Sequence, residues 1–221
     1  MHKQRGFTLI EIAIVLVIIG LLLGGVLKGQ ELITSARVRN LISQQDGVKA
    51  AYFGFLDRYR ALPGDYLNAS TTITGVAATP CGTGNGNGDG QITGNEAILA
   101  WEHLSKSGFI NGSYTCDTTE SNVTTPTNPY GNRLQLIFDN VYGAAGTARH
   151  NLKTGNQIPS DILAEVDRKA DDGNALSGTF RFSVYAAGGT APAAATCYVA
   201  AAPNAWQTQT VDANCGGVTL F

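Results

Sequence analysis

The sequence is poor in charged residues and has almost no excess of either sign. Only 14% of its 221 residues are charged, and the formal net charge is −2. No basic block and no patch of Lys and Arg interleaved with aromatics occurs, which leaves nucleic-acid binding without support. The few histidines stand apart from the cysteines, and no Cys-x-x-Cys pair is present, which argues against a zinc site.

Sequence signatures of catalytic sites are also missing. No serine lies in a Gly-x-Ser-x-Gly turn, and no glycine-rich phosphate loop precedes a Lys-Ser/Thr pair. The histidines His2, His103 and His150 lack companions at motif spacing. We therefore expect that the chain is not an enzyme.

The cysteines are few, and all of them follow the apolar N-terminal segment. That places them on the part of the chain expected outside the cytoplasm, where disulfides form. Three pairings are possible. We favour the sequential one, because each pair then closes a loop rich in small and polar residues, and closing the shorter loop would stabilise the fold by about 3 kcal/mol. The predicted disulfides are Cys81–Cys116 and Cys197–Cys215.

The N-terminus combines a short positive segment with a long apolar run. Residues 1–6 are polar and positive, and from Phe7 to Leu27 every residue except Thr8 and Glu11 is apolar or glycine. At about 1.5 Å per residue the run is long enough to cross a membrane. The positive leader predicts a cytoplasmic N-terminus. A simple signal anchor or a cleaved signal peptide would account for the hydropathy, but no small-residue cleavage site follows the run.

Glu11 is the residue that a simple anchor leaves unexplained. A carboxylate inside an apolar membrane segment costs several kcal/mol unless it is paired or neutralised. An acid in this position is therefore a candidate functional residue that needs a partner.

The segment Gly6-Phe7-Thr8-Leu9-Ile10-Glu11 resembles the class III signal of type IV pilins and type II secretion pseudopilins, over roughly residues 1–35. The resemblance implies that a prepilin peptidase cuts the Gly6–Phe7 bond and that the new amine of Phe7 is N-methylated. Glu11 would become the fifth residue of the mature chain. In that family its carboxylate is thought to meet the N-terminal amine of a neighbouring subunit, so that two costly buried charges satisfy each other.

The resemblance further implies a structural subunit of a type IV pilus (fimbrium) or of a type II secretion pseudopilus. Expected partners are identical or related pilin subunits, the prepilin peptidase, an inner-membrane assembly platform and membrane lipid. The chain would lie in the bacterial inner membrane as a single-pass protein with its head in the periplasm, and later in an extracellular or periplasmic filament.

Lys28 replaces the family's frequent proline, and the head is large for a minimal pseudopilin, which favours a minor or specialised subunit. A monomeric membrane-anchored calcium-binding or adhesive envelope module is the alternative.

The remaining pattern predicts an α+β pilin fold, with one long helix packed on a small antiparallel head. After the leader (1–6), residues 7–28 form the transmembrane and assembly helix, residues 29–62 its amphipathic continuation, and residues 63–221 the head. Pro63 and Gly64 end the helix. One apolar stripe of the continuation faces the head; its members are Leu41, Val48, Tyr52, Phe55, Tyr59 and Leu62.

Within the head the pattern predicts two short helices and several strands. The helices are expected at 95–107, ended by a capping glycine at Gly108, and at 160–168, with Ser160 as N-cap. Alternating residues predict strands at 134–138 and 179–184, and shorter strands at 197–200 and 218–221. Residues 66–84, 117–133 and 186–195 are expected to be loops.

Residues 85–96 fit the pattern of a twelve-residue EF-hand calcium loop. Gly90 stands where the loop turns sharply, and Ile92 is its apolar anchor. The predicted calcium ligands are Asn85, Asn87, Asp89, the backbone carbonyl of Gln91, Thr93 and Glu96. Asn at the first position leaves only two negative charges, which predicts weak, millimolar affinity. The competing interpretation is a flexible linker before a helix.

A second acidic cluster follows residue 166, made of Asp167 and the run Asp171-Asp172-Gly173. A solvated helix end and turn is the simpler interpretation. A second cation site or a subunit contact is the alternative.

Overall fold

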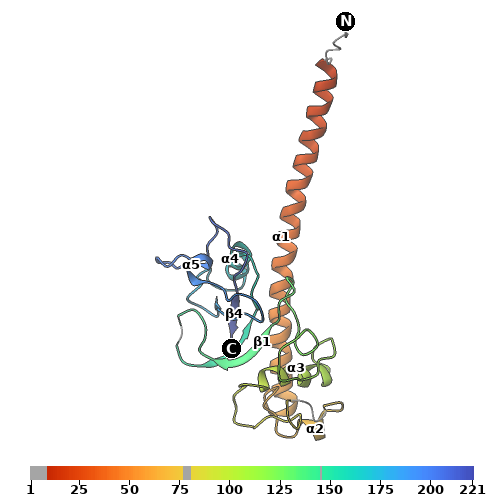
Figure 1. Cartoon of the computed structure of the whole chain (residues 1–221), viewed down its shortest axis with the longest axis vertical. Coiled ribbons are helices and arrows are strands. Elements are labelled where there is room, and N and C mark those ends of the chain that lie inside the picture. The colour runs from red at the N-terminus through yellow and green to blue at the C-terminus, as the bar shows by residue number, and fades with distance from the viewer. Residues whose placement is uncertain (1–8, 77–80, 145) are drawn as a thin grey trace. The chain divides into compact units, whose positions relative to one another are not determined.

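The computed structural model describes residues 9–76, 81–144 and 146–221. The leader, the Gly6–Phe7 bond and Thr8 therefore lie outside the described residues. The chain divides into two compact units, Met1–Arg37 and Val38–Phe221. Helix α1 (Leu9–Tyr59) contributes its first part to one unit and its second part to the other (Figure 1).

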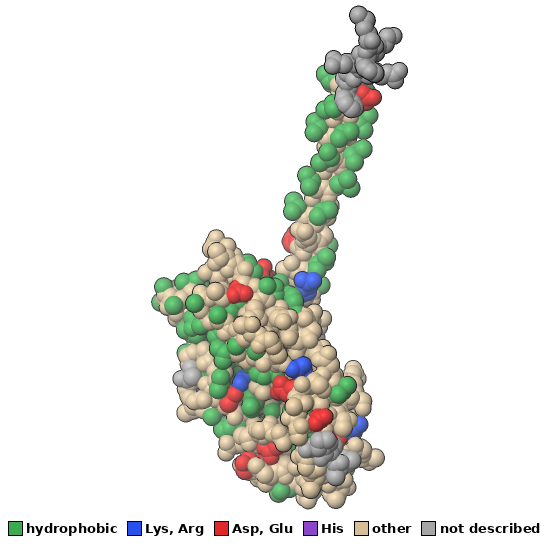
Figure 2. Space-filling model, in the orientation of Figure 1, with side chains coloured by type: hydrophobic (Ala, Val, Ile, Leu, Met, Phe, Trp, Pro, Cys, Tyr) green, Lys and Arg blue, Asp and Glu red, His purple; other side chains and the backbone are tan. Residues whose placement is uncertain are grey.

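The first part of α1 has no core of its own. The first buried residue in the described helix is Val38. Before it, Leu, Ile and Val side chains are exposed, and Figure 2 shows them along this part of the helix. Among the described residues, α1 is the one helix long and apolar enough to cross a membrane. A helix that is apolar all round must be covered by lipid or by other helices.

The second part of α1 forms one wall of the head's core. Leu41, Val48, Tyr52 and Phe55 are buried, which confirms the apolar stripe, while Tyr59 and Leu62 are only partly buried. The helix ends at Tyr59, earlier than predicted. The reason is local: Arg60 adopts a left-handed conformation (φ 54°), which stops the helix before Pro63 is reached.

Four antiparallel strands form the sheet of the head. They are β1 (Gln135–Asp139), β2 (Arg149–Lys153), β3 (Phe180–Phe182) and β4 (Gly217–Leu220), in the order β1-β2-β4-β3. The long apolar helix together with this small antiparallel sheet confirms the α+β pilin fold. β4, although last in sequence, lies between β2 and β3.

Helix α3 (Glu96–Lys106) matches its prediction closely. It ends as expected at Gly108, whose φ is +80°. The N–H of Gly108 donates to Ser105 O and that of Phe109 donates to Leu104 O, at 3.1 and 2.9 Å. This pair of bonds is the Schellman motif, which satisfies carbonyls left open by the helix end.

Helix α4 (Ser160–Ala170) also forms, with Ile162, Leu163 and Val166 buried as predicted. The N-cap prediction is wrong. Pro159 holds the cap position, and the Ser160 hydroxyl instead accepts a bond from the N–H of Asp212 at 3.2 Å. A tertiary contact has replaced the local one.

The predicted strand at 197–200 is also wrong. A helical turn, α5 (Ala194–Cys197), stands there, and only an isolated bridge between Tyr198 and Trp206 follows. Another single-turn helix, α2 (Ala69–Thr72), interrupts the predicted loop 66–84. Such short elements have too little periodicity to be found in the sequence.

Strand β2 was not predicted, because its sequence Arg-His-Asn-Leu-Lys does not alternate between apolar and polar residues. Lys153 in this strand is nevertheless buried. Its ammonium forms a salt bridge with Asp139 of β1, whose carboxylate also accepts a bond from the Asn151 amide at 2.9 Å. Burial of a charge in β2 is possible because β1 provides the partner carboxylate, which Asn151 of β2 also binds.

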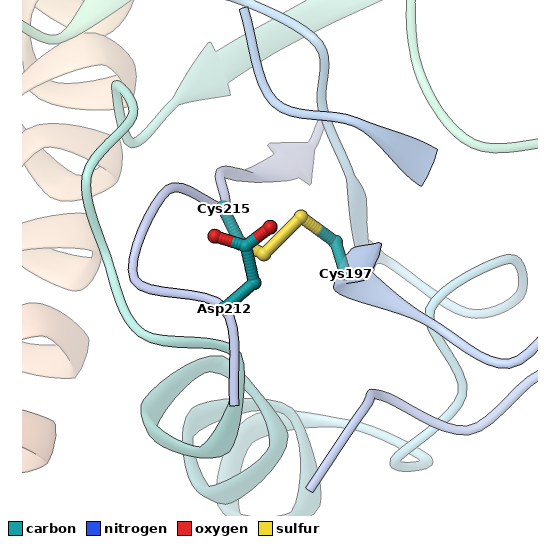
Figure 3. Close-up of side chains that lie close together, drawn as sticks. All are labelled: Cys197, Asp212 and Cys215. Atoms are coloured by element: carbon teal, nitrogen blue, oxygen red, sulfur yellow. A yellow bond between two sulfur atoms is a disulfide. The ribbon is translucent and has the colours of Figure 1, made fainter. Parts of the chain in front are cut away.

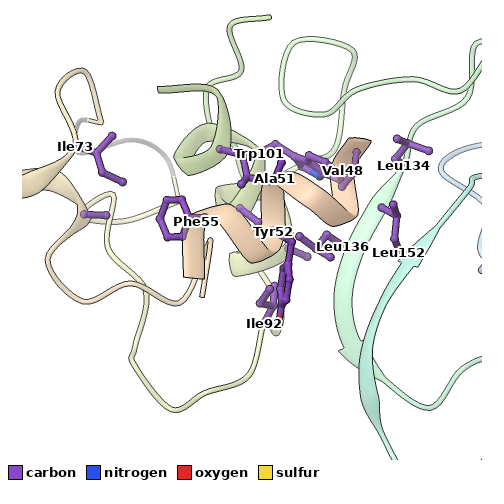
Figure 4. Packing of buried hydrophobic residues seen from close by; sticks show 14 of the residues in the cluster. Val48, Ala51, Tyr52, Phe55, Ile73, Ile92, Trp101, Leu134, Leu136 and Leu152 are labelled. Carbon is purple, nitrogen blue, oxygen red and sulfur yellow. The ribbon is translucent and has the colours of Figure 1, made fainter. Parts of the chain in front are cut away.

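The main core lies where α1, α3 and the sheet meet (Figure 4). Val48, Tyr52 and Phe55 of α1 pack with Trp101 of α3, and Leu136 and Leu152 close the cluster from the sheet. A second cluster joins the start of the head's part of α1 to α4 and β3; its members include Val38, Leu41, Ile162, Leu163, Phe180, Phe182 and Trp206. One helix therefore serves both cores.

Two disulfides close the head's long irregular segments. They join Cys81 to Cys116 and Cys197 to Cys215, which is the sequential pairing predicted from the sequence. The first encloses the 85–96 loop and α3, and the second encloses residues 198–214. Both bonds link segments with little regular structure, where restricting the unfolded chain contributes most.

Phe55→Ala should destabilise the head strongly, because Phe55 is fully buried in the main core. We expect a loss of about 3–5 kcal/mol in the free energy of unfolding, measured by denaturant titration of the full chain in detergent. Phe53→Ala is the matched control, since Phe53 is 47% exposed two residues earlier on α1. Equal losses for the two variants would contradict the assigned core.

Candidate functional site

Glu11 lies in the first turn of α1, within the apolar run. Gly6 and Phe7, the residues of the predicted cleavage and methylation site, lie outside the described residues. In the sequence Glu11 follows Phe7 by four positions, about one helical turn. A carboxylate at this position and an amine at Phe7 of another copy would be groups of opposite charge in an apolar environment.

The 85–96 loop is held in place by Asp65, a residue that no sequence pattern indicated as part of the site. Asp65, buried and located just after α1, directs its carboxylate at the glycine-rich turn. Its oxygens accept bonds from the N–H groups of Gly88 (2.5 Å), Asp89 (3.1 Å) and Gly90 (2.8 Å). Gly90 has φ +81°, so the sharp turn predicted at this glycine is present.

Glycine is also required where the loop passes Asp65. A side chain at Gly86 would place its Cβ 2.3 Å from the Asp65 Cα, which no real atom pair tolerates. The two segments are joined there by a bond from Gly86 N–H to Tyr66 O at 3.1 Å. Glycine at this position therefore allows the backbone of the loop to approach the backbone at Asp65 closely; flexibility is not its purpose.

Glu96 closes the other end of the loop. Its carboxylate accepts bonds from the N–H of Asn87 (2.9 Å) and of Thr93 (3.0 Å), three residues before it. The second bond, together with the bond from Glu96 N–H to Thr93 O, closes the turn of residues 93–96 that leads into α3. Glu96 therefore has a structural role, whether or not it also holds a cation.

Three carboxylates converge at the loop. One oxygen each of Asp65, Asp89 and Glu96 can be chosen so that all lie within 4.8 Å of one another. An all-oxygen, acidic donor set with adjacent amide oxygens suits Ca²⁺, which takes about six to eight oxygen ligands. Asp65 adds a third negative charge to the two that the sequence predicted.

The remaining predicted calcium ligands do not all lie beside these three carboxylates. The Asn85 amide oxygen accepts a bond from the N–H of Ser70 in α2 at 2.8 Å. The Asn87 amide oxygen accepts a bond from the N–H of Asp89, also at 2.8 Å. Gln91 and Thr93 are exposed. The described geometry thus groups Asp89 and Glu96 of the predicted set with Asp65, while Asn85 caps a neighbouring turn.

A second convergence of potential ligands is already used by a covalent bond. Cys197, Asp212 and Cys215 lie together (Figure 3), but the two sulfurs form a disulfide. A disulfide sulfur is not a thiolate and does not bind a metal. Asp212 instead accepts bonds from the Thr196 hydroxyl and from the N–H of Asn214, and these bonds lower the pKa of its carboxyl.

His103 of α3 links the two segments that flank the carboxylates. Its ring is fully buried, with Nδ1 accepting a bond from the N–H of Gly64 (2.9 Å) and Nε2 bonded to Gly84 O (2.9 Å). Because Nδ1 accepts, the proton of the neutral ring must be on Nε2. Burial lowers the pKa of His103 from 6.5 to about 4. A second proton would face the Gly64 N–H, donor against donor.

The head should therefore lose stability on acidification through this histidine. In the unfolded chain His103 takes up a proton near pH 6.5, whereas in the fold it stays neutral until about pH 4, so the stabilisation is present above 6.5 and disappears towards 4. Between pH 7.5 and 5 this histidine alone should cost the fold about 2 kcal/mol. Denaturant titrations at several pH values measure this, and His103→Gln should remove that part of the pH dependence. An unchanged curve in that variant would contradict the assignment.

Comparison with known proteins identifies the N-terminal segment. Residues 1–27 match the prokaryotic N-terminal methylation motif. No curated protein and no solved structure matches the chain. Residues 1–27 thus carry the class III signal that type IV pilins and pseudopilins share.

Proposed function

We propose that this chain is a structural subunit of a type IV pilus or of a type II secretion pseudopilus, and more specifically a minor or specialised subunit. The observation that carries the proposal is an intramembrane acid at the required distance from the methylation site, on a helix whose apolar side chains are exposed in the single chain. Loops rather than regular structure make up much of the head, which suits a specialised surface.

The assembly step follows from electrostatics. Cutting the Gly6–Phe7 bond creates a positive amine at Phe7, and methylation leaves its charge in place. Glu11 of one copy would pair with this amine of a neighbour within the apolar layer. Each charge is costly there alone, and pairing removes most of that cost, so that the pair favours the correct register between helices.

The proposal also assigns a location. Before assembly, α1 spans the bacterial inner membrane with the head in the periplasm, where the two disulfides can form. The partners are lipid, the prepilin peptidase, an inner-membrane assembly platform and other pilin subunits. After assembly the chain belongs to a periplasmic or extracellular filament.

Glu11→Val should leave processing intact but prevent assembly, because the amine of the neighbour then has no partner. The mature chain should still begin at methylated Phe7 by mass spectrometry, while the variant is absent from sheared or purified filaments. Glu31→Gln is the matched control, since Glu31 is an exposed acid further along α1 that pairs with Lys28 of the same helix. Incorporation of the Glu11 variant at wild-type level would overturn the role.

We also propose that the head binds Ca²⁺ at Asp65, Asp89 and Glu96, with amide and backbone oxygens of the 85–96 loop completing the shell. Support comes from the converging carboxylates and from the match of the loop to a calcium-binding pattern. The ion would relieve the mutual repulsion of the three acids. Its role would be to brace the loop.

Calcium should raise the stability of the full chain in detergent. At about ten times the dissociation constant the gain is about 1.4 kcal/mol, seen as a higher melting temperature. Asp89→Ala should abolish the gain, and Asp65→Asn should weaken it. Asp57→Ala, which changes an exposed acid near the end of α1, is the control. No calcium-dependent shift in the wild-type chain would exclude the site.

The second candidate function is a monomeric membrane-anchored calcium-binding or adhesive envelope module. The carboxylate cluster of the 85–96 loop supports this second function as much as it supports a filament subunit. Glu11 separates the two, because a monomeric anchor gains nothing from an acid in the membrane. A chain that remains anchored and monomeric with and without Glu11 would support the second function.

A further inference from the structure

Two glycines lie inside the part of α1 that belongs to the head. Gly47 and Gly54 are seven positions apart, so they face the same edge of the helix. Glycine inside a helix makes the helix less stable than alanine does, because it has more conformational freedom to lose. Each of these glycines therefore calls for a contact that alanine would not permit.

Gly54 has such a contact within the chain. The ring of Phe109, which follows α3, lies against this glycine, and a Cβ at position 54 would be 2.8 Å from the ring. Phe109 is partly buried and packs against the main core. This edge of α1 therefore already holds one aromatic ring on a glycine.

Gly47 has no such contact in the described structure. Apart from the helix itself, no described atom would lie within 4 Å of a Cβ at this position. Gly47 instead lines an open groove of about 470 Å³ between α1 and the segments 109–114 and 126–127. We call it the Gly47 groove. Most of its other lining residues are apolar or aromatic: Val48, Phe109, Ile110, Tyr114 and Pro126.

Another edge of α1 presents an exposed aromatic side chain. Phe53 is 47% exposed, and no other aromatic residue of the described chain is classed as exposed. Its ring centroid lies 5.2 Å from that of Tyr52 and 6.1 Å from that of Phe221, so neighbouring rings support it from one side. At about 100° per residue, Phe53 points about 120° away from Gly47 around the helix.

The spacing of these two features decides how they can meet. Phe53 follows Gly47 by six positions, which is about 9 Å along the helix axis. Within one chain they cannot meet, because one helix carries both and they face different directions. They can meet between two copies whose helices run in the same direction with a shift of about 9 Å along the axis. A contact between two different surfaces of one chain repeats from copy to copy and forms an open filament unless it closes into a ring.

We propose that Phe53 of one copy inserts into the Gly47 groove of a neighbouring copy, as Phe109 covers Gly54 within the chain. This inference rests on the proposed function as a filament subunit, and it names a surface of the head through which copies make contact. The occupant is a second copy, because every copy carries both the groove and the exposed ring, and copies anchored in one membrane run in the same direction. The contact lies on the same helix whose exposed apolar N-terminal part also has to be covered.

Gly47→Ala separates a role in assembly from a role in folding. In the full chain in detergent, alanine should raise the folded-to-unfolded ratio about fivefold, because it favours the helix and meets no obstacle. In filaments sheared from cells, the same variant should be less abundant than the wild-type chain. A lower ratio of folded to unfolded chain in Gly47→Ala would show that this glycine serves the single chain, and would overturn the inference.

Gly47→Leu fills the groove and should lower the amount of the chain in filaments about tenfold, as expected when one central contact of an interface is lost. Its melting temperature in detergent should not fall below that of the wild-type chain. Ala170→Leu, which enlarges an exposed residue of α4, is the matched control and should be incorporated normally. Incorporation of Gly47→Leu at wild-type level would contradict the contact.

A photoreactive phenylalanine analogue at position 53 tests the contact without removing the ring. With Phe53→benzoylphenylalanine, irradiation of cells that carry filaments should give a dimer that survives reduction. In this dimer the tryptic peptide 50–58 should be joined to peptide 40–49 or 107–133 of the groove. Val211→benzoylphenylalanine, at another exposed position, should not label these peptides.

The cross-linking results also separate this inference from the proposed function. If the wild-type chain is absent from filaments, the proposed function fails, and the inference that rests on it fails too. If filaments contain the chain but position 53 links to other peptides, to a different protein or to nothing, this inference alone is overturned.

Discussion

The head depends on burial of one stripe of α1. Tyr52 and Phe55 belong to the main core with α3 and the sheet, and Val38 and Leu41 belong to the second core with α4 and β3. Consecutive turns of one helix therefore serve both clusters, which the single sheet also links, since β3 pairs with β4 beside β2. The same helix is exposed and apolar before Val38. One element therefore combines a wall of both cores of the head with an apolar surface that must be covered by lipid or by other helices.

The sequence predicts well those features that repeat or that depend on a particular residue type. The stripe of α1, the Gly108 cap of α3 and the alternation of Phe180 and Phe182 all follow helix or strand periods. The methylation segment is recognisable because Gly6, Phe7 and Glu11 have fixed spacing. The disulfides follow from the low structural content of the segments that they close.

Features that rest on distant partners could not be found in this way. Asp65 lies twenty residues before the loop that it organises, and its own neighbours, Gly64 and Tyr66, do not reveal the contact. Strand β2 is polar in sequence, yet it is buried because Asp139 neutralises Lys153. Ser160 has the composition of an N-cap but bonds to the backbone of Asp212 instead. In each case the local structure is determined by tertiary contacts and not by the propensity of the neighbouring residues.

The position of β4 constrains when the head can form. This strand contains residues 217–220, yet it lies between β2 and β3, and without it these two strands have no common neighbour in the sheet. During synthesis α1 is complete long before β4 has left the ribosome. The sheet therefore closes only after nearly all of the chain has been synthesised. Until then β3 lacks its neighbour in the sheet, because the strand with which it pairs is β4.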